Sequence, residues 1–441
     1  MKVYFNQLAD AVCSDAVAGA ERVSLAFSAE ASDFIRFNHG SVRQATHVEQ
    51  RYGSVSVVAG GRRATGTVSL TGNPAADTRA LLAERATLLG QLPLVPADKY
   101  LLLPASPASS TRSSTGRLPA AIEVIEAVQR HAQQADLVGF YAGGPVVRAF
   151  ADSRGQRNWH EVDSFLFEWS LYRGGDQAVK SSYAGSEWDE GQLAAKMVRA
   201  RQQCAMLARP LKTLAPGDDR VYFSPVAMAE LLGTLSWGGF GLKSFKTGVS
   251  TLGRLHRGEA ALHSSVCLTE ATAGGIAPSF QDDGFVKPDA VPLVDAGRIA
   301  GTLRAPRSAV EYGVPTNAAN ADEAPESLAL AAGTLPESGV LEALGTGVYI
   351  SNLHYLNYSD RQACRMTGMT RFACFWVERG ELVAPIAVMR FDDFFIRMFG
   401  QGLVALTDST ELVPDNATDG ARQLRSISTP GAVVEGFRFT L

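Results

Sequence analysis

The sequence predicts an α+β protein in which strands outnumber helices. Short runs of alternating apolar and polar residues are joined by glycine turns, a pattern typical of antiparallel sheets. Helical periodicity is confined to a few segments and does not alternate regularly with strands, which argues against a parallel α/β fold. We expect the N-terminal half to form two units of sheet plus helix. The C-terminal half should form a glycine-rich, strand-rich domain.

The first unit covers residues 1–103 and begins with an antiparallel meander that leads into a helix. Asn38-His39-Gly40 and Gly60-Gly61 mark tight turns, because asparagine and glycine tolerate positive φ. Asn73 is a good N-cap, and Pro74 suits the first helical position. One face of the helix that follows carries leucines at positions 81, 82, 88, 89 and 92.

Residues 104–116 are rich in proline, serine and threonine, which predicts a linker or a long loop. The second unit then covers residues 117–215. Its predicted elements are a helix near 119–135 and strands around 145–151 and 163–173. A further helix is expected to start at Ser186, with Asp189 as its capping-box partner, and to end near Leu207.

The C-terminal domain is predicted to cover residues 216–441, after the Pro216-Gly217 boundary. A helix should begin at Ser224-Pro225, where serine is a favourable N-cap and proline suits the first turn. Another helix is expected from Asp392 to Leu403. Late strands are predicted at Gly347–Leu353, Arg371–Val377 and Ile386–Phe391.

The composition excludes several classes of protein. The chain has 441 residues, a net charge of -4 and no block of like charges, so a nucleic-acid partner is not expected. No apolar run reaches the length of a membrane span, roughly 20 residues. Asn6, Gln7 and Asp10 interrupt any signal-like apolar stretch, which favours the cytoplasm. The five cysteines include no CxxC pair and are interpreted as reduced thiols.

Local motifs for catalysis are incomplete. Gly238–Ser244 has the wrong spacing for a phosphate-binding P-loop, and Gly345-Thr346-Gly347 precedes a strand where a dinucleotide site needs a helix. Ser250 lacks the second glycine of a hydrolase elbow. His160-Glu161 begins like a zinc-peptidase motif, but no second histidine follows and the pair should lie on a strand.

Several segments, taken in order, resemble the TldD/TldE (PmbA) family. They are Arg51–Arg62 in the N-terminal meander and, in the C-terminal half, Leu214–Pro225, Leu344–Ser351, Asn357–Asp360, Thr367–Thr370 and Trp376–Leu382 with Pro385. The resemblance implies a C-terminal domain of the TldD/PmbA type. It also implies a link to heterodimeric zinc metallopeptidases that degrade unfolded or short peptides. Older descriptions call the family modulators of DNA gyrase.

In this family TldD carries a helical His-Glu-x-x-x-His motif and a C-terminal cysteine as zinc ligands, whereas TldE lacks them. Here the corresponding helix after Ser224 contains Val226 and Glu230 but no histidine, and no cysteine follows Cys374. The resemblance therefore implies the TldE side of the pair. We expect a non-catalytic subunit with no zinc of its own and a TldD-like partner that holds the zinc.

An extended peptide could bind a sheet edge in the cleft of such a complex. We expect His354, Tyr355 and Asn357 to contact the peptide or the cleft. Two alternatives remain open. One is a homodimeric peptide-binding scaffold. The other is an independent hydrolase with an atypical site around His354 and either Cys364 or Glu378.

Overall fold

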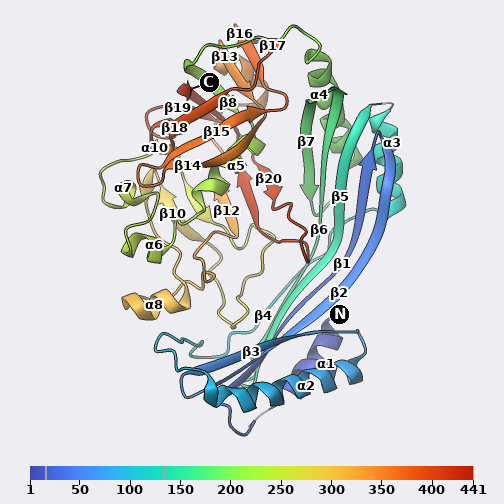
Figure 1. Cartoon of the computed structure of the whole chain (residues 1–441), viewed down its shortest axis with the longest axis vertical. Helices are drawn as coiled ribbons and strands as arrows, with labels where there is room; N and C mark the ends of the chain where they lie inside the picture. The colour runs from blue at the N-terminus through green and yellow to red at the C-terminus, as the bar shows by residue number, and fades with distance from the viewer. Residues whose placement is uncertain (15–16, 134, 441) are drawn as a thin grey trace.

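A computed structural model describes residues 1–14, 17–133 and 135–440. Strands make up 41% of the structure and form three sheets of seven, six and nine strands, and helices cover some of their faces. The predicted α+β class is confirmed. In Figure 1 the seven-stranded sheet runs along one side of the molecule, and the two C-terminal sheets lie across from it.

The N-terminal sheet has the order β3-β2-β1-β5-β6-β4, with β7 also paired to β6. Its strands are β1 (Arg22–Asn38), β2 (Ser41–Ala59), β3 (Arg62–Ser69), β4 (Ser110–Ser114), β5 (Asp136–Asp152), β6 (Arg157–Gly174) and β7 (Gln177–Gly185). The turn predicted between β1 and β2 is present, with φ of 50° at His39 and 68° at Gly40. Antiparallel pairing of β1 with both β2 and β5 makes this sheet continuous.

Two expectations for this half differ from the structure. Residues 1–103 and 117–215 contribute to one sheet, because β1 of the first segment pairs with β5 of the second. The expected linker at 104–116 contains β4, which pairs in parallel with β6. Pairing between strands far apart in the sequence leaves no local pattern, and the serine-rich composition of β4 concealed a strand at the sheet edge.

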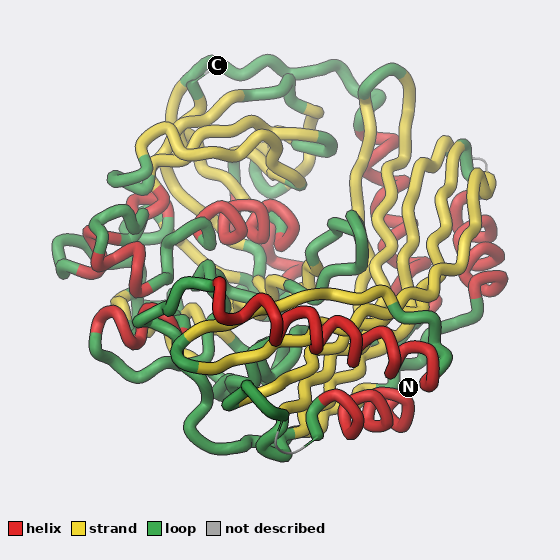
Figure 2. Tube along the Cα trace, turned by 60° about the horizontal axis from the view of Figure 1, so that its bottom comes forward, coloured by secondary structure: helices red, strands yellow, loops and turns green. Residues whose placement is uncertain are grey.

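One face of this sheet is apolar and covered by helices. Alternate residues of β1, such as Val23, Leu25 and Phe27, pack beneath α1 (Lys2–Val12) and α2 (Pro74–Gln91). The same face continues to Phe37, where α3 (Ala121–Ala132) and α4 (Glu190–Met206) cover it. Figure 2 shows α1 and α2 lying outside the strands. The opposite face, which is more polar, is turned toward the C-terminal domain.

One predicted helix start in this half agrees with the observed N-cap, and another does not. The Asn73 side chain accepts a hydrogen bond from the amide of Ala76 at 3.1 Å, as expected for the start of α2. The expected start of α4 at Ser186 is wrong. Asp189 is the N-cap instead, because its carboxylate accepts from the amide of Gly191 at 2.7 Å.

The C-terminal domain contains two sheets with α5 (Pro225–Leu235) between them. The nine-stranded sheet consists of β8 (Gly217–Phe223), β13 (Gly347–Ile350), β14 (Asn352–Asp360), β15 (Arg365–Arg371), β16 (Phe375–Glu378), β17 (Glu381–Pro385), β18 (Arg390–Phe394), β19 (Leu403–Leu406) and β22 (Ala432–Phe439). The six-stranded sheet consists of β9 (Leu268–Glu270), β10 (Val291–Asp295), β11 (Arg298–Ile299), β12 (Ser327–Leu330), β20 (Glu411–Pro414) and β21 (Ser426–Thr429).

The remaining helices of this domain are short. They are α6 (Leu242–Lys246), α7 (Gly253–His256), α8 (Pro306–Tyr312), α9 (Val340–Leu344) and α10 (Phe395–Met398). The helix expected from Asp392 to Leu403 is therefore mostly wrong. Its first residues extend β18, which pairs with β15, and only the four residues of α10 are helical. No helix among the described residues is long and apolar enough to cross a membrane.

The loop after β20 fastens the C-terminal domain to the polar face of the N-terminal sheet (Figure 1). Arg422 in this loop is buried. Its guanidinium donates to the carbonyl of Gly144 at 2.9 Å and to the carbonyl of Ser164 at 2.7 Å. Its backbone amide donates to the Glu30 carboxylate at 3.2 Å. These bonds therefore hold the loop in a fixed position at the base of the cleft between the N-terminal sheet and the C-terminal domain.

Candidate functional site

Helix α5 projects one face into the cleft between the N-terminal sheet and the C-terminal domain. Ser224 caps the helix by accepting from the amide of Ala227 at 3.2 Å, and its hydroxyl donates to the carbonyl of Ser351 at 2.6 Å. This confirms the predicted start at Ser224-Pro225. Met228 and Leu231 are buried in the core on the opposite face. The cap and the core contacts together fix which α5 side chains face the cleft.

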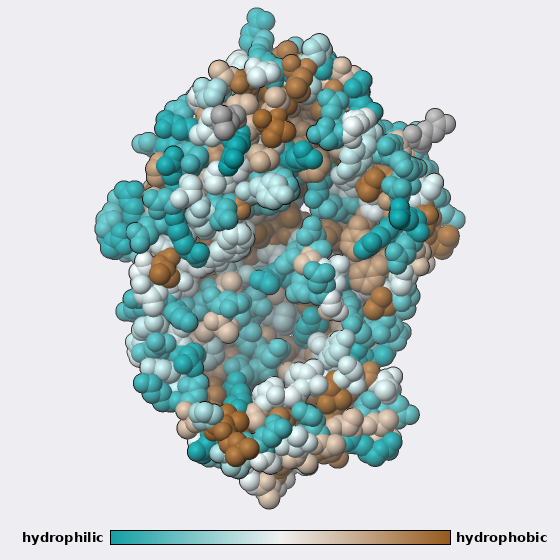
Figure 3. Space-filling model, in the orientation of Figure 1, coloured by the Kyte–Doolittle hydropathy of each residue, from teal (hydrophilic) through white to brown (hydrophobic). Residues whose placement is uncertain are grey.

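A cavity of about 420 Å³ lies against the exposed face of α5. Val226 and Glu230 line it from the helix. Its other lining residues include Leu166 and Glu168 of β6, Lys180 and Ser182 of β7, Trp237, Leu356 of β14, and segments 324–325, 413–416 and 425–427. Figure 3 shows the surface hollowed between the two parts, with many hydrophilic side chains around the hollow.

The charges in this cavity are only partly paired. Lys180 forms an ion pair with Glu168 at 2.9 Å. The Glu230 carboxylate has no hydrogen bond or ion pair among the described residues, and the side chain is open to the cavity. The surrounding walls nevertheless raise the pKa of the Glu230 carboxyl, while Lys180 opposes that rise. A carboxylate that still lacks a partner is available to a ligand.

Three sheet edges surround α5. Within the described residues, β7 pairs only with β6, β20 only with β21, and β14 only with β15. Both β14 and β20 lie against α5, and β20 also lies against β7 (Figure 1). An edge strand has backbone N–H and C=O groups without partners, and an extended peptide can pair with them. The cavity thus combines a side-chain pocket with backbone available for pairing.

A profile of the PmbA/TldA metallopeptidase C-terminal domain matches residues 216–441, which is just over half of the chain. The chain belongs to the PmbA/TldD family. The resemblance read from the sequence is thereby confirmed. No curated protein sequence matches the chain.

Three solved structures show the same fold. TldE from Thermococcus kodakarensis is 13% identical with a TM-score of 0.79, over 96% of this chain and 97% of that one. A candidate modulator of DNA gyrase from Thermotoga maritima is 13% identical with a TM-score of 0.75, over 95% and 96%. Another from Bacteroides thetaiotaomicron is 14% identical with a TM-score of 0.75, over 100% and 98%.

The residues on α5 do not fit the zinc site that the PmbA/TldD resemblance implies for a catalytic member. Glu230 is the only potential ligand among the α5 residues that line the cavity. Cys374 is buried, its thiol donates to the carbonyl of Arg371 at 3.2 Å, and burial raises its pKa, so it is not a ready thiolate ligand. Among the described residues, no group of three His, Cys, Asp or Glu side chains could hold a metal ion.

The site residues predicted from the sequence fall into two places in this family member. Val226 and Glu230 line the α5 cavity. His354, Tyr355 and Asn357 lie on the edge strand β14 with exposed side chains, and they are not among the lining residues. Leu356 of the same strand lines the cavity, at a point where the register of β14 shifts between His354 and Asn357 and Tyr355 has a φ of 52°. Peptide contact by the three exposed residues stays a prediction.

The proposed alternative nucleophile and acid around His354 are poorly prepared for catalysis. Cys364 is fully buried, and burial raises the pKa of its thiol to about 12, whereas nucleophilic cysteines need an accessible thiolate. The Glu378 carboxylate already accepts hydrogen bonds from Trp376 at 2.7 Å and Lys212 at 3.2 Å. These contacts hold the pKa of Glu378 below its usual range.

Sequence reasoning missed the residues that complete the cavity from other elements. Glu168 and Lys180 lie on β6 and β7, more than forty positions from α5. In the sequence, each of the two is a single charged residue within a strand whose apolar and polar residues alternate. Only the pairing of β6 with β7, which brings Glu168 opposite Ser182, and the contact of β7 with β20 place them in this cleft.

Proposed function

We propose that this chain is a non-catalytic, TldE-like subunit of a TldD/TldE-type zinc metallopeptidase in the cytoplasm. In this role it binds part of an extended peptide in the α5 cleft, while a TldD-like partner supplies the zinc and the hydrolytic chemistry. Family membership and the whole-length similarity of fold to TldE support the proposal.

The observation that carries the proposal is the composition of the cleft face of α5. Val226 and Glu230 face the cavity, and the helix has no histidine to hold a metal. Without imidazole ligands, this helix cannot fix a zinc ion or lower the pKa of a zinc-bound water. The cavity and its sheet edges, by contrast, are suited to holding peptide without cleaving it.

The edges suggest how the peptide would bind. An extended segment could pair with the free edge of β7 or β20 and place alternate side chains toward α5. Such pairing relies on backbone hydrogen bonds and tolerates varied sequences. That tolerance agrees with unfolded or short peptides as the substrate class.

The first experiment measures metal and activity with and without a partner. The purified chain alone should contain no stoichiometric zinc and should cleave no peptide. A tagged copy expressed in its native host should recover a homologue that carries His-Glu-x-x-x-His, and the complex should cleave unfolded peptides. One tightly bound zinc per isolated chain, or cleavage by the isolated chain, would refute the proposal. Recovery of the chain only with itself would favour the homodimeric scaffold.

A second measurement tests the cleft itself. Val226→Trp should fill much of the α5 cavity and reduce peptide cleavage by the complex severalfold, without loss of the partner. Val198→Trp is the matched control, because Val198 is 55% exposed on α4 and does not line the cavity. Equal activity of both variants would show that the peptide does not use this cavity.

A further inference from the structure

A second cavity, of about 490 Å³, lies on the polar face of the N-terminal sheet beside the α5 cavity. Strands β1, β2, β5 and β6 line it, together with Asn416 and Thr418 of the loop after β20. Glu168 and Asn416 line both cavities, so the two are adjacent. An extended peptide that leaves the α5 cleft across β6 would therefore enter the second cavity.

One row of cross-strand neighbours joins the two cavities. Arg36 of β1 lies opposite Phe140 of β5, and Phe140 lies opposite Glu168 of β6. Glu168 is in turn opposite Ser182 of β7, which lines the α5 cavity. Residues directly opposite one another have their side chains on the same face of the sheet. Neighbouring strands are about 4.8 Å apart, so Arg36 is roughly 10 Å from Glu168, the length of about three extended residues.

Arg36 and Arg43 supply the positive charge of the second cavity. Both side chains are exposed, and neither makes a hydrogen bond or an ion pair among the described residues. The Arg36 guanidinium lies 5.8 Å from the centre of the Phe140 ring, within the range of a cation–π contact. Because a guanidinium stacked on a ring face keeps the N–H groups in its own plane free, Arg36 can still donate to a ligand.

The acids on this face of the sheet already have partners. Glu168 is the one acid among the described residues that line the cavity, and it pairs with Lys180 at 2.9 Å. Asp136 of β5 lies on the same face and bonds to His39 at 2.7 Å. The two arginines therefore form an excess of positive charge beside the α5 cleft.

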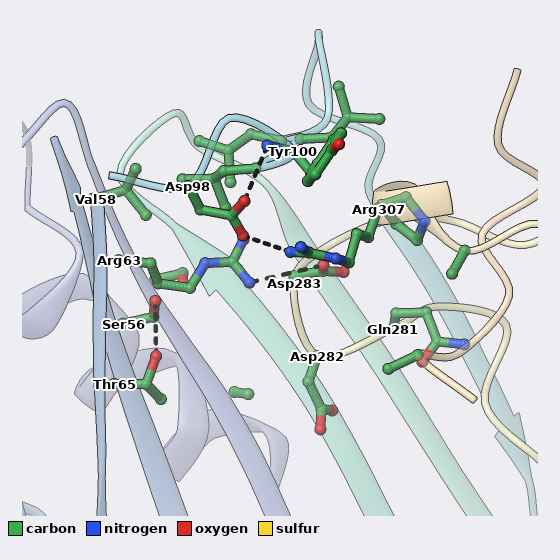
Figure 4. A pocket seen from close by; sticks show the side chains of 18 of the residues that line it. Ser56, Val58, Arg63, Thr65, Asp98, Tyr100, Gln281, Asp282, Asp283 and Arg307 are labelled. Carbon is green, nitrogen blue, oxygen red and sulfur yellow. Dashed lines mark hydrogen bonds and ion pairs between the residues drawn. The ribbon is translucent and has the colours of Figure 1, made fainter. Parts of the chain in front are cut away.

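Arginines at the opposite end of the sheet show the contrast. There a cavity of about 570 Å³ is lined by arginines that lie beside acids. Arg307 donates to Asp98 at 2.7 Å, and Arg63 is 3.9 Å from Asp283 (Figure 4). The two arginines near the α5 cleft have no such partners among the described residues, so their charge is available to a ligand.

We propose that Arg36 and Arg43 bind a carboxylate of the peptide that occupies the α5 cleft, and that peptides with a carboxylate at this position are preferred. This inference rests on the proposed function, since it requires a peptide in that cleft. A guanidinium has five N–H donors in a planar fork that matches the two oxygens of a carboxylate. The carboxylate can belong to an acidic side chain or to the C-terminus of the peptide, about three extended residues beyond the α5 cavity.

Fluorescence anisotropy with the full-length chain and three labelled peptides of one unstructured sequence tests this inference. The first peptide has internal glutamates and an amidated C-terminus. The second has glutamines in their place and the same amide, and the third has the glutamines and a free C-terminus. The first or the third should bind about fivefold more tightly than the second, as expected for exposed ion pairs with arginine. The peptide that gains affinity identifies the source of the carboxylate.

The double variant Arg36→Gln/Arg43→Gln should bind the three peptides equally. Arg79→Gln/Arg298→Gln is the matched control, because it removes the same charge. Arg79 and Arg298 are exposed on α2 and β11, and neither lines the two cavities. The control should keep the preference for a carboxylate. All four side chains are exposed, so both double variants should fold, and circular dichroism checks this.

A preference that is lost in Arg36→Gln/Arg43→Gln and kept in the control supports the inference. A preference unchanged in Arg36→Gln/Arg43→Gln, or lost equally in the control, overturns it. If the three peptides bind the unaltered chain equally and Val226→Trp weakens all three, the inference is overturned and the proposed function of the α5 cleft stands. If no peptide binds the chain, either alone or in complex with its partner, the inference and the peptide-binding role of the cleft are both overturned.

Discussion

His160 shows how a single residue can resemble a catalytic motif and serve the structure. It lies on β6 with 1% of its surface exposed, and its Nε2 bonds to the carbonyl of Ile276 at 3.0 Å. Burial lowers its pKa to about 4, and the positive charges of Arg112 and Arg148 act in the same direction. The imidazole is therefore neutral at pH 7 and donates to a loop of the C-terminal domain.

This depressed pKa predicts a pH dependence of stability. Between about pH 6.5 and 4 the unfolded chain binds a proton at His160 that the folded chain excludes, so the free energy of unfolding should fall as the pH falls. The contribution is present above pH 6.5 and amounts to roughly 3 kcal/mol, taking about 1.4 kcal/mol per pKa unit.

His160→Gln, whose amide can still donate to Ile276, tests this prediction. Urea unfolding of both proteins from pH 7 to 4.5 should show that the unaltered protein loses more stability than the variant. His263→Gln is the control, because His263 is exposed. An unchanged difference between His160→Gln and the unaltered protein across this range would contradict the assignment of a neutral buried histidine.

Helix α5 is the element on which sequence and structure agree most closely. Its start could be predicted because Ser224 and Pro225 are local signals that act through the adjacent amides. The missing histidines could be read directly from the chain. The failed prediction of a helix at 392–403 has the opposite cause. Phe391 to Phe394 pair with β15, and that distant partner decides their conformation against a locally helical pattern.

Removing the cap of α5 should cost stability out of proportion to the size of the change. Ser224→Ala leaves the amide of Ala227 without its partner and the carbonyl of Ser351 without its donor. Both groups are buried, so we expect the free energy of unfolding to fall by roughly 1–3 kcal/mol. Ser236→Ala near the other end of α5, where the hydroxyl bonds to Leu232, should change it by about 0.5 kcal/mol or less.

Chemical denaturation of the two serine variants measures this difference. Peptide cleavage by the complex should fall with Ser224→Ala as well, since the cap sets the position of Val226 and Glu230 in the cleft. Equal stabilities of Ser224→Ala and Ser236→Ala would mean that core packing alone holds the start of α5.

At the scale of the whole molecule, the two halves are joined by buried polar contacts that the sequence could not reveal. Arg112 of β4 donates to the carbonyls of Thr272 and Gly275 at 3.0 and 2.7 Å. Gln156 donates to the carbonyl of Gly284 at 2.7 Å. Each contact joins residues more than one hundred positions apart, and single arginines or glutamines carry no sign of their distant acceptors. The fold class could be predicted from local sequence patterns, but the cleft between the halves could not.

Arg422 makes several of these buried contacts, and we expect it to couple the stability of both halves. Arg422→Lys cannot reach the carbonyls of Gly144 and Ser164 and the Ser164 hydroxyl in the same geometry, because a lysine lacks the planar fork of donors. Leaving these buried acceptors without full partners should lower the free energy of unfolding by roughly 2–4 kcal/mol.

Hydrogen exchange measured by mass spectrometry can test whether the stability lost in Arg422→Lys is lost from both halves of the molecule. Protection should fall both in β1 and β5 of the N-terminal sheet and in β20 and β21 of the C-terminal domain. Arg425→Lys is the matched control, since Arg425 is exposed and lies 3.9 Å from Asp415, and it should change protection little. If Arg422→Lys increased exchange only within the loop 415–425, the halves would be stable independently. The cleft would then be free to open about that loop, and β7 and β20 would not form a fixed pair of edges for a peptide.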